Sequence, residues 1–359
     1  TEVVDSKTIE VSTPEVGGLD YITTELAVSN LVNESWSNIL EITFEKIVAV
    51  FIDSTQIDGI AGSGEYPGGL TFDTEGNCYV QGSDGTIYQI NSSGQVSQFS
   101  TGVPVPFVGG ELHIGPDNQY LYVATAWTDW AWDVWDGASG GLYRISLNDG
   151  TVEEYISGTD IWHPYSFDWD ADGNMYVASY YVWNNYYYWD ENVVINGALI
   201  NKVTPNKTIQ PLKEYALNAP IGYGGLLRIY NNEFYVYNWA DNESYDDSHG
   251  IRKSGITDSG ISADLEVMYE PSDWSPDNLH AATFLALDGA GNAYLMNRGY
   301  NSAVEKVTPD RTITTLATLP SEPVAGAFHG DFLYVATTNG GIYTLFIGET
   351  AQGGVPPKL

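Results

Sequence analysis

The chain has 359 residues and a formal charge of −34, from 47 acidic and 13 basic residues. This charge excludes nucleic acid as a partner, because nothing in the chain can neutralise a row of phosphates, and it disfavours an anionic membrane surface. No apolar run reaches the roughly 18 residues of a transmembrane helix, so we expect no membrane insertion. The 11 Trp, 26 Tyr and 11 Phe are too many for a disordered acidic chain, so the protein is expected to fold.

One sequence motif recurs along the chain: an alternating apolar strand, a polar turn, and a second strand with Tyr-Val or a variant of it. Its six copies lie at residues 68–80, 110–124, 165–179, 225–238, 284–297 and 325–337. The alternation predicts strands and Asp-x-x-Gly-Asn supplies turn residues, so each copy predicts an antiparallel hairpin. Further pairs of short strands follow, for example at 85–99, 140–155, 198–212 and 304–316. The copies are roughly 40 to 60 residues apart, and each predicts four strands. Repeats of this length and content predict an all-β fold, a six-bladed β-propeller with four-stranded antiparallel blades.

The sixth copy is followed by only one clear strand, at 340–348. The apolar segment 45–53 is the candidate for its missing outer strand, and this N-terminal strand would close the ring and remove a sheet edge. The alternative folds are a β-sandwich and a β-helix, and six equivalent hairpins with variable loops argue against both.

We therefore expect a propeller over residues 45–348, with an N-terminal extension or cap at 1–44 and a tail at 349–359. Within the extension, residues 23–40 read as a short amphipathic helix or as irregular chain.

The long insertions are predicted at one end of the blades. In a blade with strands A to D from inner to outer, the A–B and C–D turns share one face, and the B–C loops lie on the other. The B–C segments at 124–141, 180–197 and 238–250 are long, whereas the A–B turns and most C–D turns are short. Ligand sites gather where loops lengthen on a rigid scaffold, so the loop-rich face is the expected functional face.

These insertions are rich in aromatic side chains, which combine a large apolar surface with a polar tip. The predicted ligand-binding residues are Trp127, Trp130, Trp132, Trp135, Tyr181, Trp183, Tyr187, Trp189, Tyr223 and Trp239. Such a funnel suits a sugar, an aromatic metabolite or a cation, and the acidic residues between the aromatics favour a cation, a metal or hydroxyl groups. The alternative is that the loops pack on each other as a lid, which is compatible with a pocket wall.

The residue before each inner strand is expected to point toward the axis at the loop-rich end. In chain order these residues are Glu65, Glu111, His163, Tyr223, His280 and Glu322. Two histidines and one carboxylate suit zinc or another transition metal with an open position, or a general base with a hydrogen-bonding partner. The candidate catalytic residues are therefore His163 and His280, for which a hydrogen-bonded structural role is the alternative. His113 and His329 read as structural.

Two further features read as structural. Residues 168–173 begin like a calcium loop, but Ser179 stands where that loop needs an acid, so a β-turn is the better account. Cys78, the only cysteine, lies among apolar residues of a predicted strand, which indicates inert packing and allows no intrachain disulfide.

The blade pattern over about residues 60–345 resembles the six-bladed superfamily of gluconolactonase, senescence marker protein and luciferin-regenerating enzyme. It is also similar to virginiamycin B lyase and NHL-repeat propellers. Residues 64–67 (GEYP) resemble the superfamily's G-E-x-P segment, whose Glu binds the catalytic divalent metal, and this resemblance implies that Glu65 is a metal ligand. The other ligands of that superfamily, an Asn and an Asp, open later inner strands, where this chain has His163, Tyr223 and His280. Lyases of the wider group use histidine at the mouth, which matches the histidine pair better.

Three functions remain open. The first is a metal-dependent hydrolase or lyase for a small lactone, ester or sugar-like compound, with Glu65, His163 and His280 as ligands of calcium or a transition metal. The second is a non-catalytic surface propeller that binds a glycan, a metal ion or a protein partner. The third is a structural surface protein.

The composition also bears on location and assembly. Few Lys, many Gly, Asn, Tyr and Trp, and strong acidity fit an exported protein, so we expect a secreted, periplasmic or cell-surface monomer. The chain begins at Thr1 rather than Met, as expected after removal of a signal peptide or after trimming.

Overall fold

The structure is a computed structural model. It describes residues 48–61, 68–103, 110–125, 141–157, 161, 164–179, 200–212, 223–239, 250–257, 260–261, 266–269, 282–297 and 302–347, and short strands before residue 41. The chain divides into two compact units, Thr1–Ala49 and Val50–Leu359.

The first unit contains two antiparallel strand pairs. Strand β1 (Glu2–Val3) pairs with β2 (Ile9–Glu10), and β3 (Leu26–Asn30) pairs with β4 (Ser35–Leu40). The expectation of a helix or irregular chain over residues 23–40 is therefore wrong for the residues of β3 and β4. Short apolar runs fit either period, and here the pairing of two runs decided in favour of strands.

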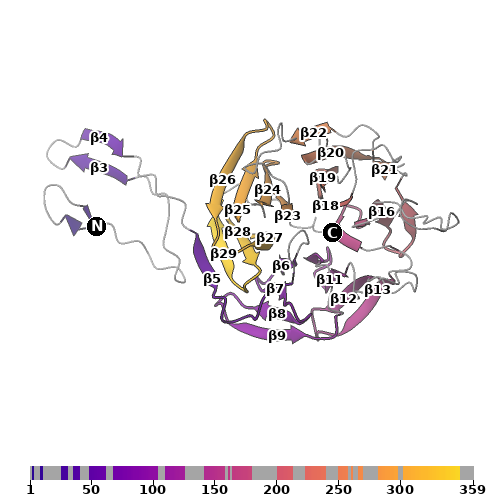
Figure 1. The fold of residues 1–359 in the computed structure, drawn as a ribbon. Helices are drawn as coiled ribbons and strands as arrows, with labels where there is room; N and C mark the ends of the chain where they lie inside the picture. Colours follow the sequence, from indigo (N-terminus) through magenta and orange to yellow (C-terminus); the bar gives the residue numbers. More distant parts are fainter. Residues whose placement is uncertain are drawn as a thin grey trace. The chain divides into compact units, whose positions relative to one another are not determined.

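Across the described residues of the second unit, the strands form six antiparallel sheets that stand around a common centre (Figure 1). The strands of the first three sheets are β6 (Leu70–Phe72), β7 (Cys78–Gln81), β8 (Ile87–Ile90), β9 (Val96–Ser100), β10 (Leu112–Ile114), β11 (Tyr120–Thr125), β12 (Gly141–Ser146), β13 (Val152–Ser157), β14 (Pro164–Trp169), β15 (Met175–Ser179), β16 (Ile200–Val203) and β17 (Ile209–Pro211). Those of the last three are β18 (Tyr223–Tyr230), β19 (Glu233–Trp239), β20 (Gly250–Thr257), β21 (Gly260–Ile261), β22 (Glu266–Tyr269), β23 (Ala282–Leu287), β24 (Ala293–Asn297), β25 (Ala303–Val307), β26 (Ile313–Thr318), β27 (Pro323–His329), β28 (Phe332–Thr337), β29 (Ile342–Phe346) and β5 (Ala49–Ile52).

The blades follow one another around the ring. Inner strands contact one another from blade to blade: β6 contacts β10, β14 contacts β18, β18 contacts β23, β23 contacts β27, and β27 contacts β6 again. The second and third blades meet through β11 and β14. The six-bladed, four-stranded propeller predicted from the repeats is confirmed. The fourth blade departs from the pattern, because β20 pairs with both β21 and β22. The last sheet has the order β27-β28-β29-β5, so β5, which lies within the predicted segment 45–53, is its fourth strand.

The core lies between adjacent blades rather than in one central layer. Between the sixth and first blades, for example, Leu70, Cys78 and Val80 pack in one cluster with Val324 and Ile342. Cys78 is fully buried there, and burial together with the Asp73 charge raises the pKa of its thiol. The prediction of inert packing for Cys78 is therefore confirmed.

The A–B turns of the first, third and fifth blades share one hydrogen-bonded design. In the third blade, Asp170 Oδ1 accepts the backbone N–H of Asp172 (3.0 Å) and of Asn174 (2.8 Å). Its Oδ2 accepts hydrogen bonds from Asn174 Nδ2 (2.8 Å) and from Tyr176 Oη (3.0 Å). The turn prediction for residues 168–173 is confirmed, because the carboxylate serves its own turn. The same bonds recur at Asp73 and Asp288.

The strand bounds separate a turn end from a loop end of the ring. The A–B connections and most C–D connections are tight turns, and blades of antiparallel strands place all of them at one end. The long B–C connections join β11 to β12, β15 to β16 and β19 to β20, and they fall at the other end. The predicted asymmetry of the connections is thus present in the strand bounds.

Candidate functional site at the axis of the ring

Most of the predicted site residues lie outside the described residues. These are Glu65, His163, His280, Trp127, Trp130, Trp132, Trp135, Tyr181, Trp183, Tyr187 and Trp189. For Tyr223 and Trp239 the structure describes the backbone: they are the first residue of β18 and the last of β19, and they pair directly. Tyr223 and Trp239 are therefore neighbours at the loop end of the fourth blade.

A buried polar cluster joins the inner strands of the second, third and fourth blades. Glu111 directly precedes β10, Ser166 lies in β14 and Arg228 lies in β18. Glu111 is 3% exposed, Ser166 is fully buried and Arg228 is 8% exposed. Charged side chains are rarely buried to this degree unless they are paired, so this cluster is the first place to look for function.

Glu111 is the centre of the cluster. Its Oε1 and Oε2 each accept a hydrogen bond from Arg228, at 2.9 Å, in a two-pronged ion pair. Oε2 also accepts hydrogen bonds from Ser166 Oγ (2.7 Å) and from the Phe167 N–H (3.3 Å). The same oxygen lies 3.1 Å from His113 Nε2. Both carboxylate oxygens of Glu111 are therefore occupied by donors from this protein.

The same cluster ties the inner strands to one another through the backbone. Ser166 Oγ accepts the Leu227 N–H at 2.8 Å, and Asp168 Oδ2 accepts the Ile229 N–H at 2.8 Å. These bonds satisfy edge N–H groups of β18 from side chains of β14, so the third blade is held to the fourth.

The charges of the cluster determine its protonation. Burial acts to raise the pKa of Glu111, but the charges and hydrogen bonds of Arg228 and His113 outweigh it and lower the pKa to about 2. Burial raises the pKa of Asp168, and Arg228 and His113 oppose that shift. Glu111 is therefore a permanent anion near neutral pH, which keeps the ion pair intact.

This arrangement can hold strands but offers no reactive centre. Ser166 donates to Glu111 rather than to His113, so no activated nucleophile is assembled. Both oxygens of Glu111 are bound by Arg228, so the carboxylate is engaged in the ion pair. His113 packs edge-on against Phe167 (5.1 Å between ring centres) and contacts Glu111, which confirms its predicted structural role.

Sequence reasoning placed Glu111 toward the axis but missed Arg228 and Ser166 as its partners. One signal was present: Arg228 interrupts an otherwise apolar strand, and a lone charge at such a position indicates a buried ion pair.

Within the described ranges, no group of three or more His, Cys, Asp or Glu side chains is arranged to hold a metal ion. The described part of the chain also contains no helix long and apolar enough to cross a membrane.

Several solved structures have a similar fold. A gluconolactonase from Xanthomonas campestris matches with a TM-score of 0.58 and 11% identity, over 83% of this chain and 89% of that one. A streptogramin B lyase matches with a TM-score of 0.51 and 16% identity, over 83% of this chain and 97% of that one. An auxiliary nutrient binding protein from Bacteroides thetaiotaomicron matches with a TM-score of 0.58 and 12% identity, over 89% of this chain and 82% of that one. The fold is shared by enzymes and by a binding protein. No protein-family model and no curated protein sequence matches the chain.

At these identities the likeness shows the propeller fold alone. Function must therefore be argued from the site.

Proposed function

We propose that the protein is an exported, metal-dependent hydrolase or lyase that acts on a small lactone, ester or sugar-like compound at the loop end of the ring. The observation that carries the proposal is the asymmetry of the connections. Long B–C segments rich in Trp, Tyr and acidic residues all belong to one end, and the opposite end consists of tight turns. The Glu111 cluster supports a rigid inner ring beneath that end.

The residues proposed to hold the metal are Glu65, His163 and His280. His163 directly precedes β14, His280 stands two residues before β23, and the inner strands all run in the same direction. From this position in the chain, we expect the three residues at one end of the ring. A carboxylate with two imidazoles is a donor set that suits zinc or another transition metal, whereas calcium would need more oxygen ligands.

A divalent metal bound there would supply a Lewis acid that polarises a carbonyl or activates water. His163 or His280, when not bound to metal, has the chemistry of a general base. The Trp and Tyr side chains of the B–C segments would hold the substrate by its apolar or sugar faces.

The alternative is a non-catalytic surface propeller for a glycan, a metal ion or a protein partner. The structural match to an auxiliary nutrient binding protein is the observation that favours it.

The first test is metal analysis of the full chain purified without chelator, with melting curves before and after chelation. We expect a stoichiometric divalent ion, and a lower melting temperature after its removal. His163→Ala and His280→Ala should each lose the metal and reduce kcat/KM on a panel of lactones and esters by at least ~100-fold.

The matched control is His329→Ala, because His329 is exposed at the turn end and stacks on Phe72 (4.6 Å between ring centres). Absence of bound metal together with no effect of chelator would reject the metal site. Metal binding or glycan binding without turnover would favour the binding propeller.

A further inference from the structure

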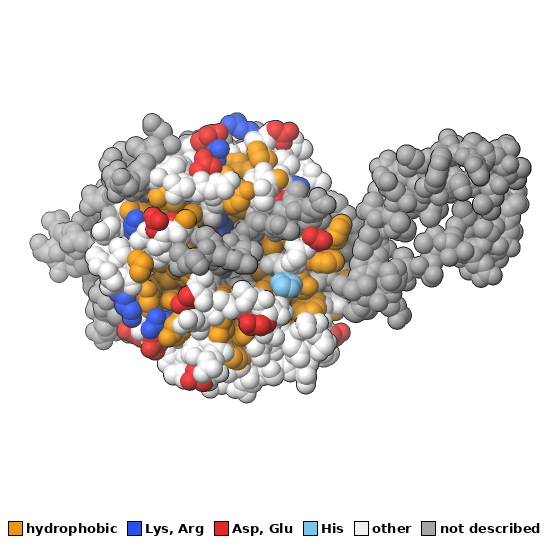
Figure 2. All heavy atoms as spheres, turned by 180° about the vertical axis from the view of Figure 1, so that it is seen from behind, with side chains coloured by type: hydrophobic (Ala, Val, Ile, Leu, Met, Phe, Trp, Pro, Cys, Tyr) orange, Lys and Arg blue, Asp and Glu red, His pale blue; other side chains and the backbone are white. Residues whose placement is uncertain are grey.

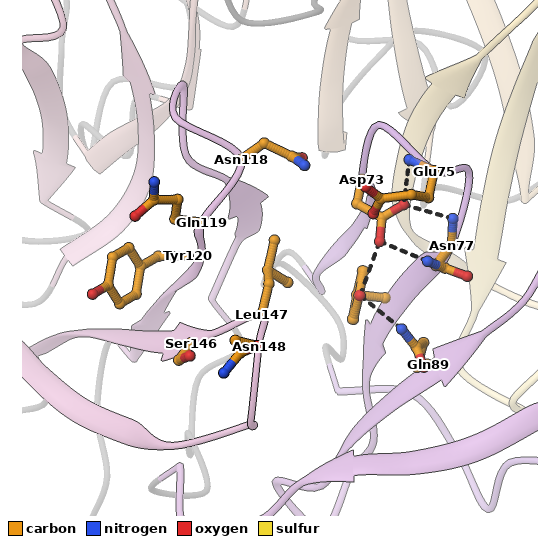
Figure 3. A pocket seen from close by; sticks show the side chains of 11 residues that line it. Asp73, Glu75, Asn77, Gln89, Asn118, Gln119, Tyr120, Ser146, Leu147 and Asn148 are labelled. Atoms are coloured by element: carbon orange, nitrogen blue, oxygen red, sulfur yellow. Dashed lines mark hydrogen bonds between the residues drawn. The ribbon is translucent and has the colours of Figure 1, made fainter.

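A polar pocket lies between the first and second blades at the turn end of the ring (Figure 3). Its volume is about 520 Å³. One wall is the β6–β7 hairpin with β8, and the other is the β10–β11 turn with the end of β12. The pocket belongs to the end opposite the long B–C connections, so it is separate from the site of the proposed function.

The lining is made of amides, carboxylates and hydroxyls. The first blade contributes Asp73, Glu75, Asn77 and Gln89, and the second contributes Gln119 and Asn148 among others. No Lys, Arg or His is among the described residues that line it. In a chain of charge −34, such a pocket disfavours anionic ligands.

Part of this lining is committed to the fold and forms rigid walls. Asp73 accepts four hydrogen bonds, from the N–H groups of Glu75 (3.0 Å) and Asn77 (2.8 Å), from Asn77 Nδ2 (2.8 Å) and from Tyr79 Oη (3.0 Å). Asn118 bridges the two blades, because its Nδ2 donates to Thr74 Oγ1 at 2.7 Å and its Oδ1 accepts the Thr74 N–H at 3.2 Å. The two walls are therefore fixed relative to each other.

Another part of the lining is uncommitted. Gln89 donates one Nε2 hydrogen to Tyr79 Oη (2.8 Å), which leaves its Oε1 for a ligand. The side chains of Gln119, Asn148 and Glu75 are exposed, and the structure gives them no hydrogen bond among the described residues. Figure 3 shows the groups of the two blades on opposite sides of the gap.

The chemistry of these groups selects the ligand. Each amide offers both donors and an acceptor, and the carboxylate adds a strong acceptor, a combination that matches the paired hydroxyls of a sugar. A divalent cation would find only the Glu75 carboxylate, because Asp73 is saturated.

The lining is also particular to this pair of blades. The corresponding pocket between the fourth and fifth blades, of about 350 Å³, also has an amide and a carboxylate, but Lys253 and Arg311 add two cations to its lining. At the position of Gln89, the third and fifth blades carry Lys202 and Lys306, which lie over the rings of Tyr176 and Tyr294.

We propose that the pocket between the first and second blades binds a neutral carbohydrate, through the side chains of Gln89, Gln119, Asn148 and Glu75. This site is independent of the proposed catalytic function.

The test is saturation-transfer NMR on the full chain with glucose, galactose, mannose, xylose and N-acetylglucosamine, and with β-1,4-linked trisaccharides of glucose, xylose and N-acetylglucosamine. We expect at least one of these probes to bind with a Kd of about 1 mM, as for a shallow polar site. The double variant Gln119→Ala/Asn148→Ala should weaken binding about tenfold, because it removes two amides that contact the ligand. Its melting temperature should hardly change, because both side chains are exposed.

Two further variants locate the site and define the ligand. Glu75→Gln should weaken sugar binding by less than ~threefold, because an amide still bonds a hydroxyl. Asn206→Ala, in the exposed C–D turn of the third blade, is the matched control and should leave binding unchanged.

Unaltered affinity in Gln119→Ala/Asn148→Ala would overturn the proposal. Absence of saturation transfer from every sugar at about 10 mM would overturn it as well. Binding of Ca²⁺ that competes with the sugar and disappears in Glu75→Gln would identify a cation site instead.

Discussion

Glu111 illustrates how one carboxylate near the axis of a propeller is committed to the fold. It lies 117 residues from Arg228 in the chain, yet the two side chains form a buried two-pronged ion pair. Removing one member of such a pair leaves a buried charge without a partner, which costs far more than the pair itself contributes. Ser166 and the Phe167 N–H add neutral donors to the same oxygen, so the cluster joins three blades.

The lowered pKa of Glu111 predicts a pH dependence of stability. Its pKa falls from an ordinary 4.5 to about 2 in the folded protein, so the stabilisation is complete above about pH 4.5 and is lost as the pH falls toward 2. We expect the wild type to lose roughly 3 kcal/mol more than the double variant Glu111→Gln/Arg228→Met between about pH 5 and about pH 2. Urea unfolding across this range measures the difference, and parallel curves for the two proteins would contradict the assignment.

At the scale of elements, the A–B turns alternate around the ring. The first, third and fifth blades carry the Asp-Asn-Tyr design at Asp73, Asp170 and Asp288, and the second, fourth and sixth carry other turns. In the second blade, Asp117 is exposed, and among the described residues it accepts one hydrogen bond, from the Gln119 N–H (3.0 Å). The buried Tyr hydroxyl of the first design is satisfied by the turn itself, so the turn also anchors the strand that follows.

This difference predicts unequal costs for two matched substitutions. Asp170→Ala should destabilise the protein by about 3 kcal/mol, because the buried Asn174 amide and Tyr176 hydroxyl lose their acceptor. Asp117→Ala should cost less than ~0.5 kcal/mol, since its single bond is at the surface. Urea denaturation of both variants measures the difference, and similar losses would mean that the four bonds of Asp170 add little.

At the scale of the whole molecule, the charge of −34 is spread over a surface with few cations. On the face shown in Figure 2, Lys and Arg side chains are few and most lie toward the periphery. Like charges in this number repel one another and oppose the compact state.

Salt should therefore stabilise the protein. Raising sodium chloride from about 0.01 M to about 1 M shortens the screening length from ~30 Å to ~3 Å, and we expect the melting temperature to rise by several degrees. The control is the same pair of measurements near the isoelectric point of about 4.1, where the self-repulsion and its salt dependence should shrink. A melting temperature that does not depend on salt at neutral pH would contradict this account.

Much of the architecture followed from the sequence because its determinants are local. Period-two alternation and short polar turns, of the Asp-x-x-Gly-Asn type in three copies, specify each hairpin within about a dozen residues, and six copies in succession indicate a ring of blades. The turn at 168–173 and the packing of Cys78 were predictable for the same reason. The pair β3 and β4 was not, because its short runs carry no decisive period.

The site was less accessible to sequence reasoning. The sequence directed Glu111 toward the axis, and it marked the B–C segments and the histidines His163 and His280 as the candidates for function. The tertiary structure alone decided that Glu111 meets Arg228, and that the turns of the first and second blades enclose an amide-lined pocket. A turn is determined by residues that are neighbours in the chain, whereas a contact between blades depends on how closely the inner strands approach around the ring. That approach is a property of the whole closed circle, and no single repeat contains it.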